Sequence, residues 1–228
     1  ITRKLMIEYG SAVDEELDFL SLCVNNGVSL AIAGSTGSGK TTDLSYLIEC
    51  LDADKRVYTI EDTRELNIAK LNDKGIMENR VVQTVTKDGV NPVTMDDLLK
   101  EALRFHPDVI IPAEMRGGEA LTAVEAGRTG HTIISTLHAN SAIDAYNRIL
   151  SMCVSTGVRL SESKLLEFIL EAMPLVLFKR QLPDGRRVYD EIFEGQRVEN
   201  GRIVGQTLYK YEIKENIYGE DGKIKRVI

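Results

Sequence analysis

Apolar residues recur along the chain in short runs that alternate with stretches of helical spacing. VSLAIA at 28–33 reads as a buried strand, and Leu44, Leu47, Ile48 and Leu51 then repeat along one helix face. Further strands are predicted at 56–60, 81–85, 108–113 and 132–137, with helices around 94–105, 118–127 and 141–154. This alternation predicts an α/β fold with a mainly parallel sheet covered by helices on both faces.

Two helix starts are marked by capping residues. Thr94 is followed by Asp97, and Ser141 by Asp144, each pair standing ahead of a helical apolar pattern. A hydroxyl at the cap and an acid three residues later can each accept a backbone N–H at the start of a helix. Both predicted starts follow strands or loops, as an α/β fold requires.

The pattern changes after a helix predicted at 161–172. Strand-like segments follow, and the first two are joined by PDG, a turn signal. We therefore expect an antiparallel β appendage at 174–214 and a polar tail at 215–228. The core domain is expected at 28–173, and 1–27 is expected to be a linker or helix that leads from a missing N-terminal domain.

Composition limits the classes of protein. Apolar residues make up 43% and charged residues 28%, which is normal for a globular domain. The net charge of −7 argues against bulk electrostatic binding of nucleic acid. The three cysteines are scattered and lie in apolar stretches, which favours reduced thiols. No apolar run is long enough for a transmembrane helix, so any membrane role is expected to be peripheral.

A phosphate-binding loop follows the first predicted strand. GSTGSGKT at 34–41 matches G-x-x-x-x-G-K-[ST], in which glycines let backbone N–H groups point at phosphate oxygens. Lys40 is expected to reach the β and γ phosphates, and the Thr41 hydroxyl to coordinate Mg²⁺. ATP is favoured over GTP because the chain has no N-K-x-D sequence. The expected nucleotide-binding residues are Gly34, Ser35, Thr36, Gly37, Ser38, Gly39, Lys40, Thr41 and Thr42.

Acidic residues end two of the predicted parallel strands. Glu61 and Asp62 follow RVYTI, and Glu114 follows DVIIPA, at the sheet edge where ligands bind in such folds. Many phosphate-loop enzymes have an Asp where this chain has Ala113. We therefore expect Glu61 or Asp62 to take over part of the binding of the metal and of the attacking water. Glu114 is left to position or deprotonate the nucleophile.

Four sequence boxes together resemble one family, the secretion ATPases of bacterial type II and type IV secretion, type IV pili and Tad pili. They are GSTGSGKTT (34–42), TIEDTREL (59–66), LRFHPDVIIPAEMRGGEA (103–120) and TGHTIISTLHANSAIDA (129–145). The order and spacing of the boxes also match the family, and their sequences are most similar to the Tad/Flp and type IV secretion branch. The resemblance implies a RecA-like nucleotide-binding domain.

The resemblance also implies roles for individual residues. Glu61 and Glu114 would act on Mg²⁺ and water, and Arg116 could fix the carboxylates or approach phosphate. The histidine box maps onto His131 and His138, of which His138 is the better candidate to sense the nucleotide. The chain departs from the family pattern at Ala113, where Gly is common, and at Asp43, where an apolar residue is usual.

The expected function is Mg²⁺-dependent ATP hydrolysis that drives pilus assembly or protein secretion. The resemblance implies a homohexamer in the cytoplasm, peripheral at the inner face of the membrane, working with an inner-membrane platform protein. Two alternatives remain at this point. One is a DNA-handling RecA-like ATPase, which single-stranded DNA would stimulate, and the other is a nucleotide-binding assembly scaffold that does not hydrolyse.

Overall fold

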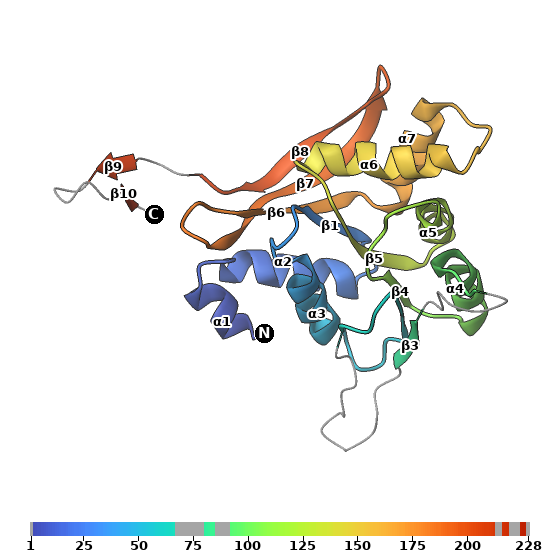
Figure 1. Ribbon diagram of the computed structural model, residues 1–228, viewed down its shortest axis with the longest axis horizontal. Helices are drawn as coiled ribbons and strands as arrows, with labels where there is room; N and C mark the ends of the chain where they lie inside the picture. The colour runs from blue at the N-terminus through green and yellow to red at the C-terminus, as the bar shows by residue number, and fades with distance from the viewer. Residues whose placement is uncertain (1, 67–79, 85–91, 213–215, 219–223, 227–228) are drawn as a thin grey trace.

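An eight-stranded sheet forms the centre of the computed structural model, which describes residues 2–66, 80–84, 92–212, 216–218 and 224–226 (Figure 1). The strands of this sheet are β1 (Leu30–Gly34), β2 (Val57–Glu61), β3 (Arg80–Thr84), β4 (Val109–Pro112), β5 (Thr132–Leu137), β6 (Leu175–Gln181), β7 (Arg187–Glu199) and β8 (Arg202–Lys210). The helices are α1 (Arg3–Glu8), α2 (Asp14–Asn25), α3 (Lys40–Cys50), α4 (Met95–Ala102), a 3₁₀ turn η1 (Leu103–Phe105), α5 (Glu119–Arg128), α6 (Ala142–Ser155) and α7 (Glu162–Ala172).

The strands lie in the order β3-β2-β4-β5-β1-β6-β7-β8. Pairing is parallel from β3 through β6, and antiparallel from β6 to β7 and from β7 to β8. This confirms the predicted α/β fold with a mainly parallel sheet. It also fixes the functional geometry, because all six parallel strands end at the same edge.

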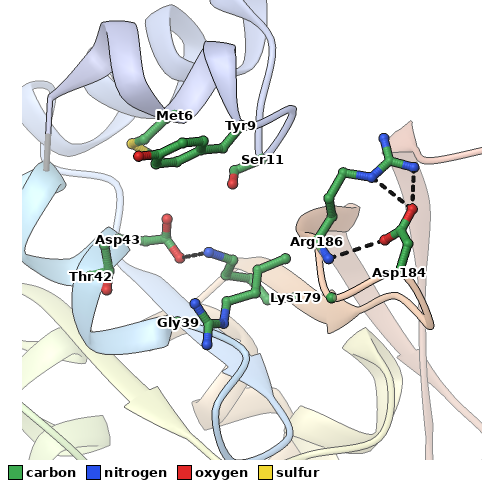
Figure 2. A pocket seen from close by; sticks show the side chains of 11 residues that line it. Met6, Tyr9, Ser11, Gly39, Thr42, Asp43, Lys179, Asp184 and Arg186 are labelled. Atoms are coloured by element: carbon green, nitrogen blue, oxygen red, sulfur yellow. Dashed lines mark hydrogen bonds and ion pairs between the residues drawn. The ribbon is translucent and has the colours of Figure 1, made fainter.

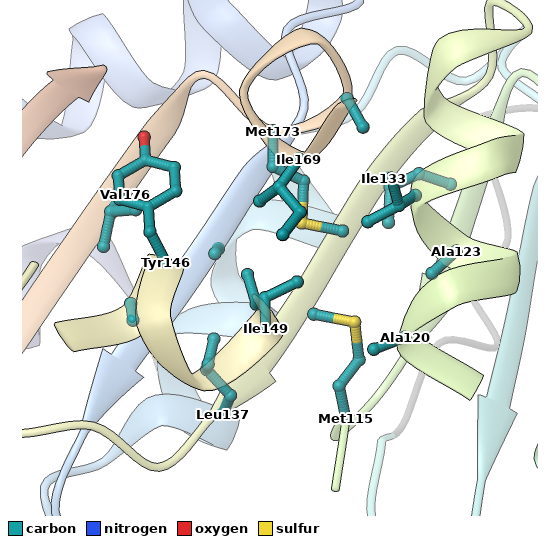
Figure 3. Packing of buried hydrophobic residues seen from close by; sticks show 14 of the residues in the cluster. Met115, Ala120, Ala123, Ile133, Leu137, Tyr146, Ile149, Ile169, Met173 and Val176 are labelled. Carbon is teal, nitrogen blue, oxygen red and sulfur yellow. The ribbon is translucent and has the colours of Figure 1, made fainter. Parts of the chain in front are cut away.

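Side chains that alternate along the strands form two separate cores. In β1, Leu30 and Ile32 pack with α1, α2 and α3 on one face, whereas Ala31 and Ala33 pack with α4 to α7 on the other. Figure 3 shows the second core, in which Ile149 of α6 and Ile169 of α7 meet Ile133 and Val176 of the sheet. Both faces are therefore covered, which explains why the parallel strands are apolar throughout.

The C-terminal segment differs in part from the expected appendage. β6 pairs in parallel with β1, so the segment at 174–214 continues the main sheet, and antiparallel pairing begins only at β7. The reason is that β6 follows α7 as another strand–helix–strand crossover, and only the PDG turn reverses the chain. Within the expected polar tail, β9 (Asn216–Tyr218) and β10 (Ile224–Arg226) form a separate antiparallel pair.

Capping residues fix several helix starts. Thr94 and Asp97 form the predicted reciprocal box, since Asp97 N donates to Thr94 Oγ1 at 3.1 Å and Thr94 N donates to Asp97 Oδ2 at 3.0 Å. At α6 the backbone N–H of Asp144 donates to Ser141 Oγ at 3.0 Å, while its own carboxylate accepts from Asn140 N. No helix among the described residues is both long and apolar enough to cross a membrane.

One capping carboxylate is buried and is expected to make stability depend on pH. Glu16 Oε2 accepts from Val13 N at 2.8 Å at the start of α2, and burial raises the pKa of Glu16 to about 7. In the unfolded chain a glutamate ionises near pH 4.3, so the folded protein holds the extra proton between these values. Folding is therefore favoured at the acidic end of this window and weakens as pH rises through it.

We predict that Glu16→Gln removes this pH dependence. The amide keeps an oxygen for Val13 N but cannot ionise, so the variant should gain on the order of 1–3 kcal/mol over wild type between pH 5 and pH 8. Urea denaturation at both pH values measures the gain, with Glu15→Gln on the exposed side of α2 as the control. Equal pH slopes for wild type and Glu16→Gln would contradict the assignment.

Candidate functional site

Four neighbouring parallel strands deliver their following residues to one edge of the sheet. In sheet order, β2 ends in Glu61, β4 leads to Glu114, β5 leads to His138, and β1 leads to the loop that begins at Gly34. Glu114 also bridges to Thr136, so β4 and β5 stay in register beyond the end of β4. Residues far apart in the sequence therefore meet where the sequence analysis expected a nucleotide.

The loop between β1 and α3 has the conformation that its glycines predict. Gly37 and Gly39 have φ of 77° and 89°, a left-handed conformation that side chains disfavour. Gly34 is needed for space, because a Cβ there would lie 2.5 Å from the Lys179 carbonyl oxygen. Gly39 is the N-cap of α3, so the first N–H groups of the helix stand at the loop.

Lys40 holds its ammonium group inside this loop. Its Nζ donates to the carbonyl oxygens of Gly34 and Ser35, each at 3.0 Å, and lies 3.5 Å from His138 Nδ1. Burial lowers the pKa of Lys40, an effect that the nearby Glu114 carboxylate opposes. The loop thus presents a positive charge beside the start of a helix, an arrangement that favours phosphate.

Glu114 is the centre of a chain of polar and charged groups. Its Oε1 lies 3.1 Å from His138 Nε2, and its Oε2 accepts from Arg116 at 2.6 Å. Arg116 also reaches Asp62 Oδ2 at 3.5 Å. Burial by itself would raise the pKa of Glu114, but Arg116, then His138 and Lys40, outweigh it and lower the pKa. Glu114 is therefore an ionised acceptor at neutral pH.

Glu61 is almost fully buried at the end of β2, and only one of its carboxylate oxygens accepts hydrogen bonds from the residues that the structure describes. Its Oε1 accepts from the backbone N–H groups of Glu65 and Leu66, both at 2.9 Å, while its buried Oε2 has no hydrogen-bond partner. Both Glu61 and Thr41 line a small cavity of about 130 Å³, together with Asp62, Glu114 and Arg116.

This cavity fits a divalent cation held mainly by oxygen. Glu61 Oε2 is an orphaned buried acceptor, and the Thr41 hydroxyl lines the same space. In the described part of the chain no three His, Cys, Asp or Glu residues form a metal cluster. Mg²⁺ usually takes one or two carboxylates and completes its shell with water and phosphate oxygens, so Glu61 Oε2 and the Thr41 hydroxyl are the groups here that could hold it.

His131 does not share this site, contrary to the expectation. It precedes β5, whereas His138 follows it, and six extended residues span about 20 Å. His131 Nδ1 lies 3.3 Å from the Ala126 carbonyl oxygen, at the opposite edge of the sheet. The two histidines of one sequence box are thus separated by the full length of the strand.

The structure adds residues that the sequence analysis did not select. Arg187, the first residue of β7, donates from Nε to the Gly37 carbonyl oxygen at 2.6 Å. Lys179 of β6 pairs with Asp43 of α3, and Tyr189 donates to Asp43 Oδ1 at 3.2 Å. The available signals were a lysine in an apolar strand and an acid in an apolar helix slot.

A larger cavity of about 410 Å³ opens beside the loop (Figure 2). Gly39 and Thr42 form its side toward the loop, and Met6 of α1 and Tyr9, the C-cap of α1, lie across from them. Asp184 and Arg186 of the β6–β7 turn close another side. The cavity is therefore continuous with the first turn of α3, next to the expected phosphate position.

Three comparisons place these features among known proteins. The chain is 40% identical to the type IV secretion system protein PtlH of Bordetella pertussis, over 60% of this chain and 40% of that protein. It is 34% identical to the conjugal transfer protein TrbB of Rhizobium radiobacter, over 86% and 56% of the two chains. The chain thus spans about half the length of these relatives.

A solved structure agrees with the fold. The VirB11 ATPase of the Brucella suis type IV secretion system, in complex with sulphate, superposes with a TM-score of 0.69 at 30% identity. The match covers 83% of this chain and 54% of that one. In addition, the family model described as type II/IV secretion system protein matches residues 3–184, which is most of the chain. The chain therefore belongs to the type II/IV secretion system protein family, on its type IV secretion branch.

Proposed function

We propose that this chain binds ATP with Mg²⁺ at the loop from Gly34 to Thr41 and hydrolyses it to power type IV secretion or a related pilus-assembly process. The observation that carries the proposal is the meeting of Lys40, Glu61, Glu114 and His138 at one sheet edge. Membership of a secretion ATPase family supports the proposal that hydrolysis powers secretion or pilus assembly.

Each side chain has a role that its contacts suit. Lys40 and the first N–H groups of α3 bind the phosphates, and Thr41 and Glu61 hold Mg²⁺. When bound there, Mg²⁺ would supply positive charge that offsets the charge of the phosphates. Thr42 lies at the cavity of Figure 2, and we place the nucleoside there.

Glu114 is proposed to hold the attacking water. It is ionised and fixed from two sides by Arg116 and His138, so a free lone pair can accept a hydrogen bond from water. His138 also lies against Lys40, which links the phosphate-binding group to the water-holding group. Arg116 fixes the carboxylate and lies close to Asp62.

The working assembly is proposed to be a cytoplasmic homohexamer, peripheral at the inner membrane, that acts on an inner-membrane platform protein. The support is family membership, together with relatives named for type IV secretion and conjugal transfer. A role in Tad/Flp pili stays a prediction. A DNA-handling ATPase is less favoured because the net charge is −7, and stimulation of turnover by single-stranded DNA would support it.

Lys40→Ala is expected to abolish tight binding of Mg-ATP. The substitution removes the ammonium group from the loop, and with it the point charge that phosphate oxygens would meet. Isothermal titration measures the affinity, and Lys100→Ala on the exposed face of α4 is the matched control. Unchanged affinity in Lys40→Ala would place the nucleotide somewhere else.

Glu114→Gln separates binding from chemistry. The amide keeps the shape of the carboxylate but is a poor proton acceptor, so nucleotide affinity should persist while kcat falls at least about a hundredfold. A phosphate-release assay measures kcat, with Glu101→Gln on α4 as the control. Normal turnover in the variant would reject the role of Glu114, and binding without turnover in the wild-type full-length protein would favour the scaffold alternative.

A further inference from the structure

A buried ion pair stands directly behind the phosphate loop. Asp43 lies in the first turns of α3, Lys179 lies in β6, and their side chains are 1% and 3% exposed. The Lys179 ammonium contacts Asp43 Oδ2, and the Tyr189 hydroxyl donates to Asp43 Oδ1 at 3.2 Å. Helix α3 and the β6–β7 hairpin, which are distant in sequence, thus converge on one carboxylate.

Lys179 lies close to the loop near both Gly34 and Gly39. β6 is the parallel neighbour of β1, and in their register Lys179 lies opposite Gly34. The Lys179 Nζ would lie only 3.4 Å from a Cβ placed on Gly39, the N-cap of α3. Figure 2 shows the ammonium reaching from β6 to Asp43 beside Gly39 and Thr42. Its charge is therefore close to the N–H groups that face phosphate.

The two charges have opposite consequences for an anion at the loop. A carboxylate four residues into the phosphate-binding helix repels phosphate, whereas an ammonium in the same place attracts it. The pair is close to neutral only while both partners are present.

We propose that Asp43 and Lys179 are a positioning pair that sets the charge at the phosphate loop, and with it the affinity for nucleoside diphosphate and triphosphate. The inference rests on the proposed function, since it assumes that nucleotide binds at the loop. In a motor that must release ADP, a charge-neutral pair behind the loop keeps product binding weaker than an unpaired lysine would.

Fold stability alone explains such a pair poorly. A buried ion pair has to overcome the desolvation of both charges, and its replacement by apolar residues is often neutral or stabilising. The helix position also favours an apolar residue, since Leu44, Leu47 and Ile48 of α3 are all buried in the core. A role in the charge of the loop gives the pair a function beyond packing.

The test is the affinity for ADP, measured with a fluorescent ADP analogue in three variants. Lys179→Met leaves the acid behind the loop and should weaken binding by about tenfold, whereas Asp43→Asn leaves the ammonium and should tighten it several-fold. The double variant Asp43→Asn/Lys179→Met should return to within about threefold of wild type, because both charges are gone.

Two controls separate this from other outcomes. Tyr189→Phe removes a hydrogen bond to Asp43 without a change of charge and should leave ADP affinity within about twofold of wild type. Loss of binding in Lys40→Ala confirms that the signal comes from the loop; wild-type protein that binds no nucleotide would instead reject the proposed function.

The opposite signs of the single variants decide the proposal. Weaker binding in both Asp43→Asn and Lys179→Met, or no change in either, would overturn it, because a structural pair gives the same direction from both sides. Should Lys179→Met fail to fold, Asp43→Asn and the double variant still decide. Tighter binding of ADP in Asp43→Asn together with near wild-type binding in the double variant supports the proposal. Any other pattern overturns it.

Discussion

The arrangement of the site depends on burying one ammonium group, that of Lys40, inside a loop of backbone. An unpaired ammonium in the interior is costly, so the loop must supply acceptors for it. The carbonyl oxygens of Gly34 and Ser35 do so at 3.0 Å, and this requires the tight curve that Gly37 and Gly39 allow. The charge of Lys40 then stabilises the ionised Glu114 nearby.

The parallel sheet turns this local constraint into a site. Because β2, β4, β5 and β1 are neighbours that run in one direction, Glu61, Glu114, His138 and the loop reach the same edge. Their contacts then form a continuous path from Asp62 through Arg116, Glu114 and His138 to Lys40. A change at one end of this path can thus affect the charge at the other.

The parts of the site that the sequence could predict are those set by strand ends. The loop follows its strand directly, and Glu61 and Glu114 end apolar runs, so parallel topology alone places them together. Motif membership placed His131 with His138, but it ignores strand length, and β5 separates the two histidines so that His131 lies at the far edge of the sheet. A lysine in an apolar strand was the one signal for Lys179, and it does not predict that β6 lies beside β1 and so brings Lys179 to the loop.

The same limit explains the C-terminal segment. Its strands were predicted, and their alternation was visible, but the partner of β6 is set by the tertiary arrangement, in which β6 lies beside β1. The consequence is functional, because this pairing brings Lys179, and through β7 also Arg187, to the phosphate loop. A segment expected to be an appendage therefore contributes one wall of the site.

A crystal structure of the protein with Mg²⁺ and a non-hydrolysable ATP analogue tests the central claim most directly. The account predicts the triphosphate at the loop, with Lys40 Nζ within hydrogen-bond distance of its phosphate oxygens and the metal between Thr41 and Glu61. A triphosphate bound away from the loop, or one at the loop that Lys40 does not contact, would contradict it.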